Sequence, residues 1–210
     1  VNGVGVNQGW GVRVESGVDN VTLGSEGHGF TVNAGSGDLA AVYVVGGNDG
    51  VIVEGNMLDG GTGHALLTGG GVTNSAGTGN TLAADGPNAV AYNNGATSVG
   101  APSDNVDFVG NTFTGGDNAG LLLGVEAANS DITGNTFNGE SGYAQLELWG
   151  ENANVSGNVF AADGGIAILD SVAGHDDAQL VSANEGVIRI EGHDDTLYSS
   201  IQAAIDAASE

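Results

Sequence analysis

The feature that most constrains the fold is a short motif that returns about every 24 residues. Clear copies are VGNTF (109–113), TGNTF (133–137) and SGNVF (156–160), and weaker copies are EGNML (54–58) and TGNTL (78–82). A fixed period in this range is typical of repeat proteins, in which each repeat packs only against its two neighbours. The chain therefore has to build its core by stacking repeats.

The asparagine of the motif serves as the anchor of each repeat. The anchors are Asn56, Asn80, Asn111, Asn135 and Asn158, with a degenerate copy at Asn184 and an earlier repeat expected at Glu26. Apolar residues return three positions before the anchor (Leu23, Val53, Phe108, Ile132, Val155, Val181) and two positions after it (Leu58, Leu82, Phe113, Phe137, Phe160). A second asparagine returns six positions before it (Asn20, Asn74, Asn105, Asn129, Asn152).

Each repeat predicts short strands. Stretches such as DITGN (131–135) and GIAIL (165–169) alternate apolar and polar residues between Gly- and Asn-rich turns, which favours strands of three to five residues. Repeats of this length with several short strands predict a parallel β-helix whose coils stack at about 4.8 Å. In such a stack the anchors can hydrogen-bond amide to amide. We therefore expect Asn56, Asn80, Asn111, Asn135 and Asn158 to form a structural ladder.

These coils resemble the right-handed parallel β-helix repeats of the pectin-lyase-like superfamily, over roughly residues 18–192. The resemblance implies an all-β solenoid of about seven coils, which we place at 1–195, with an amphipathic helix at 196–210. It says little about function, because that fold hosts lyases, glycosidases, epimerases, esterases, tailspikes and non-catalytic rods.

The charge balance excludes some partners. The chain has 26 acidic residues against two arginines and no lysine, for a formal net charge of −24. This argues against nucleic acid, because nothing neutralises phosphates, and against anionic membranes. The chain has no cysteine, so disulfides and thiolate chemistry are excluded, and no segment reaches transmembrane length.

Carboxylates suggest a cation site, with Ca²⁺ the candidate ion. Acids follow several anchors by five residues, and GHDD occurs twice, at 174–177 and 192–195. Carboxylates favour Ca²⁺, and His favours a transition metal. Solvated acids would explain the same pattern. The candidate ligands are Asp85, Glu140, Asp163, Asp176, Asp177, Asp194 and Asp195, with Asp59 and Asp117 slightly out of register.

No catalytic constellation emerges from the sequence. The superfamily's lyases use a base such as arginine near Ca²⁺-binding carboxylates, and here only Arg13 and Arg189 are available. The superfamily's glycosidases carry aspartates ahead of a Gly-His-Gly, but no suitable pair precedes His28, which we interpret as a turn residue. Epimerases need acidic, His and Tyr groups together, and His64, Tyr43, Tyr92 and Tyr143 share no motif. Trp10 and Trp149 are candidates for carbohydrate binding or for covering core edges.

The C-terminal segment TLYSSIQAAIDAASE (196–210) predicts a helix. Ser199 is the expected N-cap, and Ile201, Ala204, Ile205 and Ala208 fall on one apolar face. Such a helix can cover exposed strand edges. It also resembles the segment that opens a β-helix in the superfamily, so it either closes this rod or begins a following module.

Two functions from different classes remain, and a receptor-binding tailspike module, which would normally trimerise, is a third and weaker candidate. The first is a non-catalytic structural or adhesive module of a large secreted or cell-surface protein, a rod, spacer or filament unit with Ca²⁺ as a candidate stabiliser. It would meet neighbouring modules end to end, with carbohydrate a further candidate partner, and without nucleic acid or membrane insertion. The alternative is a lyase, glycosidase or C5-epimerase type enzyme, or its remnant, acting on acidic polysaccharide.

Overall fold

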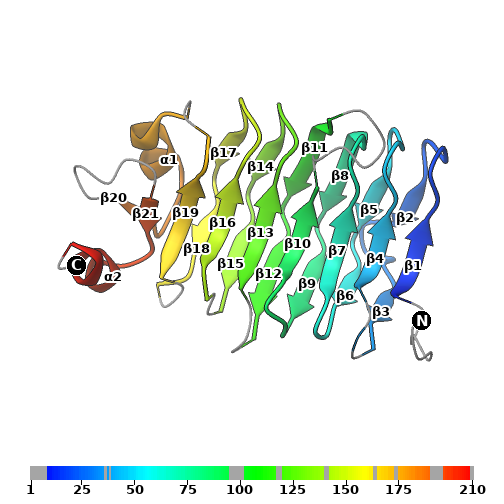
Figure 1. The fold of residues 1–210 in the computed structure, drawn as a ribbon, viewed down its shortest axis with the longest axis horizontal. Coiled ribbons are helices and arrows are strands. Elements are labelled where there is room, and N and C mark those ends of the chain that lie inside the picture. The colour runs from blue at the N-terminus through cyan, green and yellow to red at the C-terminus, as the bar shows by residue number, and fades with distance from the viewer. Residues whose placement is uncertain are drawn as a thin grey trace.

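The computed structural model describes residues 9–35, 37, 39–94, 102–116, 120–139, 142–162, 165–172, 175–189 and 196–208. Within them the protein is mostly short strands with two short helices (Figure 1). The strands form three sheets, and each sheet takes every third strand along the chain. The strands pair in parallel from β1 through β19, an arrangement compatible with a β-helix.

The largest sheet has nine strands in the order β1-β4-β7-β10-β13-β16-β19-β21-β20. Their bounds are β1 Trp10–Val14, β4 Ala40–Val44, β7 His64–Thr68, β10 Ala89–Asn93, β13 Leu121–Val125, β16 Ala144–Leu148, β19 Ile166–Asp170, β21 Thr196–Tyr198 and β20 Ile188–Arg189. The last two strands pair antiparallel, so the C-terminal end of this sheet departs from the repeat.

The other two sheets have six parallel strands each. One contains β2 Thr22–Gly24, β5 Ile52–Glu54, β8 Thr73–Thr78, β11 Asp104–Val109, β14 Asp131–Thr133 and β17 Asn154–Ser156. The other contains β3 Thr31–Asn33, β6 Met57–Asp59, β9 Thr81–Ala84, β12 Thr112–Gly115, β15 Thr136–Asn138 and β18 Val159–Phe160. The three sheets enclose one continuous apolar core.

Equivalent side chains of successive repeats stack inside this core. Phe113 and Phe137 stack with ring centroids 5.0 Å apart, and Phe137 and Phe160 at 4.6 Å with an interplanar angle of only 2°. All three side chains are at most 3% exposed. Most of the apolar positions expected from the repeat are therefore core positions, whereas Leu23 and Val181 are only partly buried and pack against the core.

A ladder of hydrogen-bonded asparagines runs along the stack from Asn56 to Asn184. Along it, the backbone N–H of each asparagine donates to the side-chain oxygen of the next, at 2.9–3.0 Å from Asn56 through to Asn184. Each side-chain amide also donates to a main-chain carbonyl of the preceding repeat, as Asn111 does to Gly77 at 2.7 Å. Burying these polar groups is tolerable because each one is paired.

The second asparagine column has a different role. Asn20, Asn74, Asn105, Asn129 and Asn152 all have positive φ, between 47° and 60°. At the ladder position the positive φ belongs instead to the preceding glycine, as in Gly110 (64°) and Gly134 (64°). Asparagine and glycine are the residues that adopt this left-handed conformation at least cost. At the ladder position the bend is thus made by the glycine, which leaves the asparagine side chain to make the ladder bonds.

One local prediction is wrong, and one helix was not anticipated. Thr31 pairs with Met57, so Phe30 rather than Glu26 lies at the anchor position of the first repeat, and its N–H donates to the Asn56 side chain at 3.1 Å. Leu23 still aligns with Val53, as expected, so the four extra residues of that repeat lie within 25–29. Helix α1 (Asp177–Ala183) was not anticipated; Asp176 caps it and Leu180 is buried beneath it. With only seven residues, α1 is too short for its apolar residues to show the 3.6-residue period of a helix, so the segment was not distinguished from the β repeats.

Helix α2 (Ile201–Ala207) lies within the predicted segment, but its details differ. Its N-cap is Ser200, whose side chain accepts from the Ala203 N–H, whereas the Ser199 hydroxyl donates to the Gly165 carbonyl. Ala204 is buried, while Ile201 and Ile205 are 69% and 53% exposed. The expected apolar face is therefore only partly used to cover the end of the sheets.

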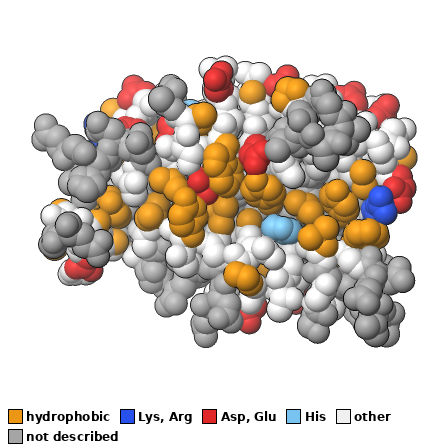
Figure 2. All heavy atoms as spheres, in the orientation of Figure 1, with side chains coloured by type: hydrophobic (Ala, Val, Ile, Leu, Met, Phe, Trp, Pro, Cys, Tyr) orange, Lys and Arg blue, Asp and Glu red, His pale blue; other side chains and the backbone are white. Residues whose placement is uncertain are grey.

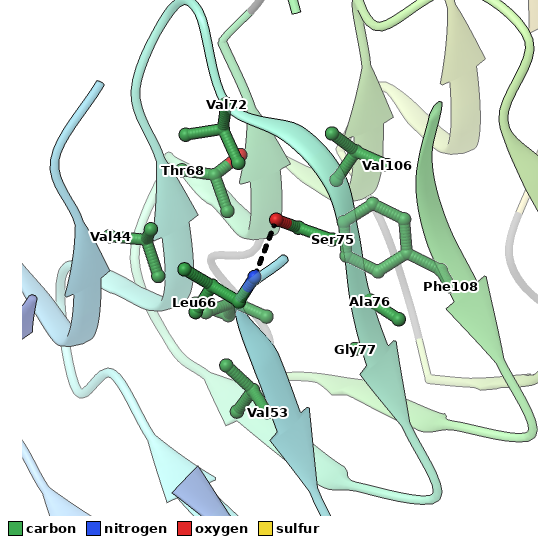
Figure 3. Close-up of a pocket in the computed structure, with 11 residues that line it drawn as sticks. Val44, Val53, Leu66, Thr68, Val72, Ser75, Ala76, Gly77, Val106 and Phe108 are labelled. Atoms are coloured by element: carbon green, nitrogen blue, oxygen red, sulfur yellow. Dashed lines mark hydrogen bonds between the residues drawn. The ribbon is translucent and has the colours of Figure 1, made fainter. Parts of the chain in front are cut away.

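The core contains a small void of about 10 Å³ where a glycine replaces an apolar residue of the repeat (Figure 3). Gly77 aligns with Val53 and Phe108 in its sheet. A Cβ at Gly77 would lie 3.4 Å from Leu66 and 3.5 Å from Phe108, and the nearby Ser75 hydroxyl accepts from the Val51 N–H at 2.9 Å. The void is at the lower limit for holding one water molecule.

Candidate functional site

The outer face of the nine-stranded sheet carries a band of apolar and aromatic side chains, which we call the outer belt. Figure 2 shows hydrophobic side chains running along this face, with acidic side chains and a histidine among them. The belt comprises Trp10, Tyr43, His64, Leu67, Tyr92, Leu121, Trp149, Ile166 and Leu169, and part of it forms an apolar cluster separate from the core. Aromatic contacts connect strands that are adjacent in space but about 25 residues or more apart in sequence.

His64, Tyr92 and Glu126 meet in the middle of this belt. The His64 and Tyr92 rings stack with centroids 6.1 Å apart, and the Tyr92 hydroxyl donates to Glu126 Oε1. His64 Nδ1 lies 2.7 Å from the Ala89 carbonyl oxygen, so Nδ1 carries a proton and Nε2 has a free lone pair. Burial lowers the pKa of His64, which keeps the ring neutral near pH 7.

The Tyr92 hydroxyl stays protonated at neutral pH. Burial raises its pKa first, and the bond to Glu126 and the charges of Glu126 and Glu147 raise it further. A phenol in this state donates a hydrogen bond but does not serve as a general base near neutral pH.

Glu147 is a second carboxylate on this face, and it is only 5% exposed. Its Oε1 accepts from the Ser171 hydroxyl at 2.8 Å and from the Tyr143 hydroxyl at 3.3 Å. Burial raises the pKa of Glu147, and these two hydrogen bonds oppose that rise because they favour the ionised form. The group is therefore a desolvated carboxylate held in one orientation.

A glycine makes room for the aromatic pair between the two carboxylates. Tyr92 and Trp149 contact edge to face, with centroids 5.8 Å apart and an interplanar angle of 80°. Gly124 lies between them in the sheet, and a Cβ there would come within 2.6 Å of Tyr92 and 2.8 Å of Trp149. We call Tyr92, Glu126, Tyr143, Glu147 and Trp149 the acid–aromatic cluster.

The N-terminal end of the belt holds a similar set of groups with a cation in place. The Arg13 guanidinium lies 4.6 Å from the Trp10 ring centroid and 3.0 Å from Glu15 Oε2. Trp10 in turn contacts Tyr43, at 5.9 Å between centroids. Trp10 and Trp149 are both half-buried on this outer face, and neither contributes to the core.

The predicted cation ligands lie in different surroundings. Asp176 accepts from the Ala178 N–H as the cap of α1, and Asp177 forms an ion pair with Arg189 at 3.3 Å. Asp85 is exposed, and Asp59 aligns with Ala83 rather than with Asp85. Glu140, Asp163, Asp194, Asp195 and Asp117 lie outside the described residues. Among the residues that are described, no three His, Cys, Asp or Glu side chains form a group suited to a metal ion.

The other candidates have structural surroundings. His28 lies in the turn that follows β2, and its N–H donates to the Ser25 carbonyl at 2.9 Å. His175 is 7% exposed; Nδ1 lies 3.0 Å from Asp170 Oδ2, and Nε2 accepts from the Ala153 N–H at 3.2 Å. Both ring nitrogens of His175 thus help to hold the start of α1 against the end of the sheets.

The acid–aromatic cluster could not be recognised as a motif. Its five residues lie between positions 92 and 149 on or beside three different strands, and no two of them are adjacent in sequence. The one available signal was their position relative to the anchors of successive repeats. Tyr92 aligns with Gly124 and Glu147 in the sheet; it precedes the next anchor by 19 residues and they precede theirs by 11, a difference caused by the insertion before Asn111.

Comparison with known proteins adds no relative. No family model matches the chain, and searches of curated proteins and of solved structures found no match. The described part of the chain contains no helix long and apolar enough to cross a bilayer.

Proposed function

We propose that this chain is a non-catalytic structural or adhesive module of a large secreted or cell-surface protein, folded as a right-handed parallel β-helix of about seven coils of the pectin-lyase-like type. The observation that carries the proposal is the buried asparagine ladder. It commits six polar side chains to holding one repeat against the next. A chain built in this way keeps its length and shape, which is what a rod or spacer requires.

The charge and the two ends of the stack support the same proposal. A net charge of −24 keeps neighbouring chains apart in solution. At the N-terminal end, β1, β2 and β3 are the edge strands of the three sheets, and at the C-terminal end α2 presents Ile201 and Ile205 to solvent. We propose that both ends meet neighbouring modules, of the same or identical chains, in an extracellular or cell-surface assembly without nucleic acid or membrane insertion.

Ca²⁺ remains a proposed stabiliser of this module. The candidates are the acidic residues that follow the anchors and the GHDD segments, led by Asp85, Asp176 and Asp177 among the described residues. If the proposal holds, millimolar Ca²⁺ raises the melting temperature and EDTA lowers it, with Mg²⁺ at the same ionic strength as the control. An equal effect of both ions would show that only charge screening is involved.

The second candidate function is a carbohydrate-active enzyme, and the acid–aromatic cluster favours it. Glu147, with its raised pKa, and Glu126 supply the two carboxylates that a glycosidase needs. His64 and Tyr92 supply groups that an epimerase or lyase uses. Removing a proton beside a uronate carboxylate also needs a cation to stabilise the new charge. Arg13 lies three strands from Tyr92, about 14 Å away, and Arg189 lies on β20.

The test is an activity screen on the purified chain. Pectin, polygalacturonate, alginate and neutral glycans are incubated with the protein, and unsaturated products and new reducing ends are measured. The proposal expects neither product. Turnover that disappears in Glu147→Gln or His64→Ala would overturn the structural proposal in favour of the enzyme.

A further inference from the structure

The outer belt contains two sets of a tryptophan, a tyrosine and at least one carboxylate, and only one of them holds a cation. At the β1 end, Trp10 and Tyr43 are in contact, Arg13 lies over the Trp10 ring, and Glu15 pairs with Arg13. At β10–β16, Trp149 and Tyr92 are in contact, with Glu126 and Glu147 beside them. The first set shows what this combination binds when a cation is present.

The sheet register shows which residue of the second set occupies the position that Arg13 has in the first. Arg13 pairs with Tyr43, Tyr43 with Leu67, Leu67 with Tyr92, and Tyr92 with Gly124. The residue in the column of Arg13 in the second set is therefore Gly124, which brings no charge and is covered by the rings of Tyr92 and Trp149, so that a cation would have to lie on the outer side of these rings. No lysine exists in the sequence, and its two arginines are engaged elsewhere, Arg13 with Glu15 and Arg189 with Asp177. No lysine or arginine of this chain can fill the second set.

We propose that the acid–aromatic cluster is a binding site for a guanidinium group, supplied by an arginine side chain of a partner polypeptide. Trp and Tyr rings attract cations through their electron-rich faces, and arginine is the cation most often found there. The carboxylates of Glu126 and Glu147 supply charge-assisted acceptors for its N–H groups. The inference rests on the adhesive form of the proposed function, because it names what the module adheres to.

The buried carboxylate gives the site its own signature. Glu147 is costly to ionise where it lies, and a bound guanidinium stabilises its charged form. Binding therefore releases protons at a pH near the raised pKa of Glu147 and strengthens as the pH rises through that range. Added salt weakens it, because the pairing with the half-buried Glu126 is open to screening.

The experiment uses the full chain carrying Trp10→Phe, so that Trp149 is the only tryptophan. Its emission is followed while acetyl-Gly-Arg-Gly-amide is added, and then the same peptide with citrulline, which has nearly the same shape but no charge. The site predicts a saturable change with the arginine peptide and none with citrulline. Glu126→Gln and Glu147→Gln are each expected to weaken binding about tenfold, whereas Glu15→Gln leaves it unchanged.

Two variants keep the test sound if one fails to fold. Glu147 is buried and its substitution can disturb the sheet, but Glu126 is only half-buried and is substituted independently. Equal response to citrulline, no saturable change, or equal weakening by Glu15→Gln overturns the site. Binding of a glucosamine oligomer or a neutral glycan in place of the arginine peptide overturns it as well. Glycan turnover by the same sample would instead overturn the proposed non-catalytic function and leave the ligand of the site standing.

Discussion

The two asparagine columns of this protein look alike in sequence and differ in what they do. Both recur once per repeat, six residues apart. In the ladder, Asn111 is 1% exposed and its side chain bonds to the main chain and the amides of adjoining repeats. In the second column, Asn129 is exposed, with a φ of 55°. In the ladder the fold requires a buried side chain. In the second column the side chains also bond between repeats, as Asn129 does to Asp104 at 2.7 Å, but these bonds are exposed, so the backbone conformation is the main requirement.

The largest expected effect comes from breaking the ladder. Asn111→Ala removes the acceptor of the Asn80 N–H and the donor to the Gly77 carbonyl, both buried. Leaving these groups unpaired is expected to lower the free energy of unfolding by about 3–5 kcal/mol. Asn111→Gly should cost at least as much. Urea unfolding at constant salt measures both, and a loss for Asn111→Ala no larger than that of a surface asparagine would contradict the ladder's role.

The same pair of substitutions should separate in the second column. Asn129→Ala places alanine, which lacks asparagine's tolerance of the left-handed region, at a φ of 55°, and should cost about 1 kcal/mol. Asn129→Gly should lie within about 0.5 kcal/mol of the wild type, because glycine adopts this conformation freely. If alanine and glycine are equally tolerated at position 129, the backbone explanation is wrong.

Two glycines, Gly77 and Gly134, test the same distinction between a requirement for side-chain packing and a requirement for backbone conformation. Gly77 has an ordinary φ, and a Cβ there would touch Leu66 and Phe108 at 3.4 and 3.5 Å, next to the void. Gly77→Ala is therefore expected to stabilise by about 0.5 kcal/mol. Gly134→Ala has open space but a φ of 64°, and should destabilise by about 1 kcal/mol. The two melting temperatures should move in opposite directions, and movement in the same direction would refute this reasoning.

The smallest expected effect concerns charge at the surface of the stack. Burial raises the pKa of Asp107, and the charge of Asp131 raises it further, while the bond from the Asp131 N–H lowers it. The folded state then holds this proton more tightly than the unfolded state, so stability falls as pH rises through the raised pKa. Asp107→Asn keeps the acceptor for Asp131 and should raise the melting temperature near pH 7 but hardly at a pH below about 4. An equal gain at both pH values would exclude ionisation as the cause.

The repeat predicts much of the fold because each repeat solves the same packing problem. Phe113, Phe137 and Phe160 recur at one position and stack as expected, and the ladder follows from the anchors. The prediction fails where the chain departs from the repeat. Phe30 takes the anchor position expected for Glu26. Helix α1 (Asp177–Ala183) takes the place of the strand that would come next to β17 in its six-stranded sheet.

The candidate site was beyond prediction for a related reason. The core position of a residue follows from its distance to the anchor, but the outer belt sits where repeats vary in length and composition. Gly124 and Tyr92 are neighbours only through the register of β10 and β13, which the insertion before Asn111 hides from the sequence. Single residues such as His64 and Trp149 were visible as candidates, and what could not be seen was that they share one face.

The most direct test of the central claim is hydrogen exchange at the asparagine side-chain amides, resolved by NMR. If the ladder holds the repeats together, the amide protons of Asn80, Asn111 and Asn135 exchange only through large-scale unfolding and are protected nearly as well as the core strands. Those of Asn74 and Asn129 should exchange rapidly. Similar rates for the two columns would contradict the account, because the buried asparagines would then open without unfolding the stack.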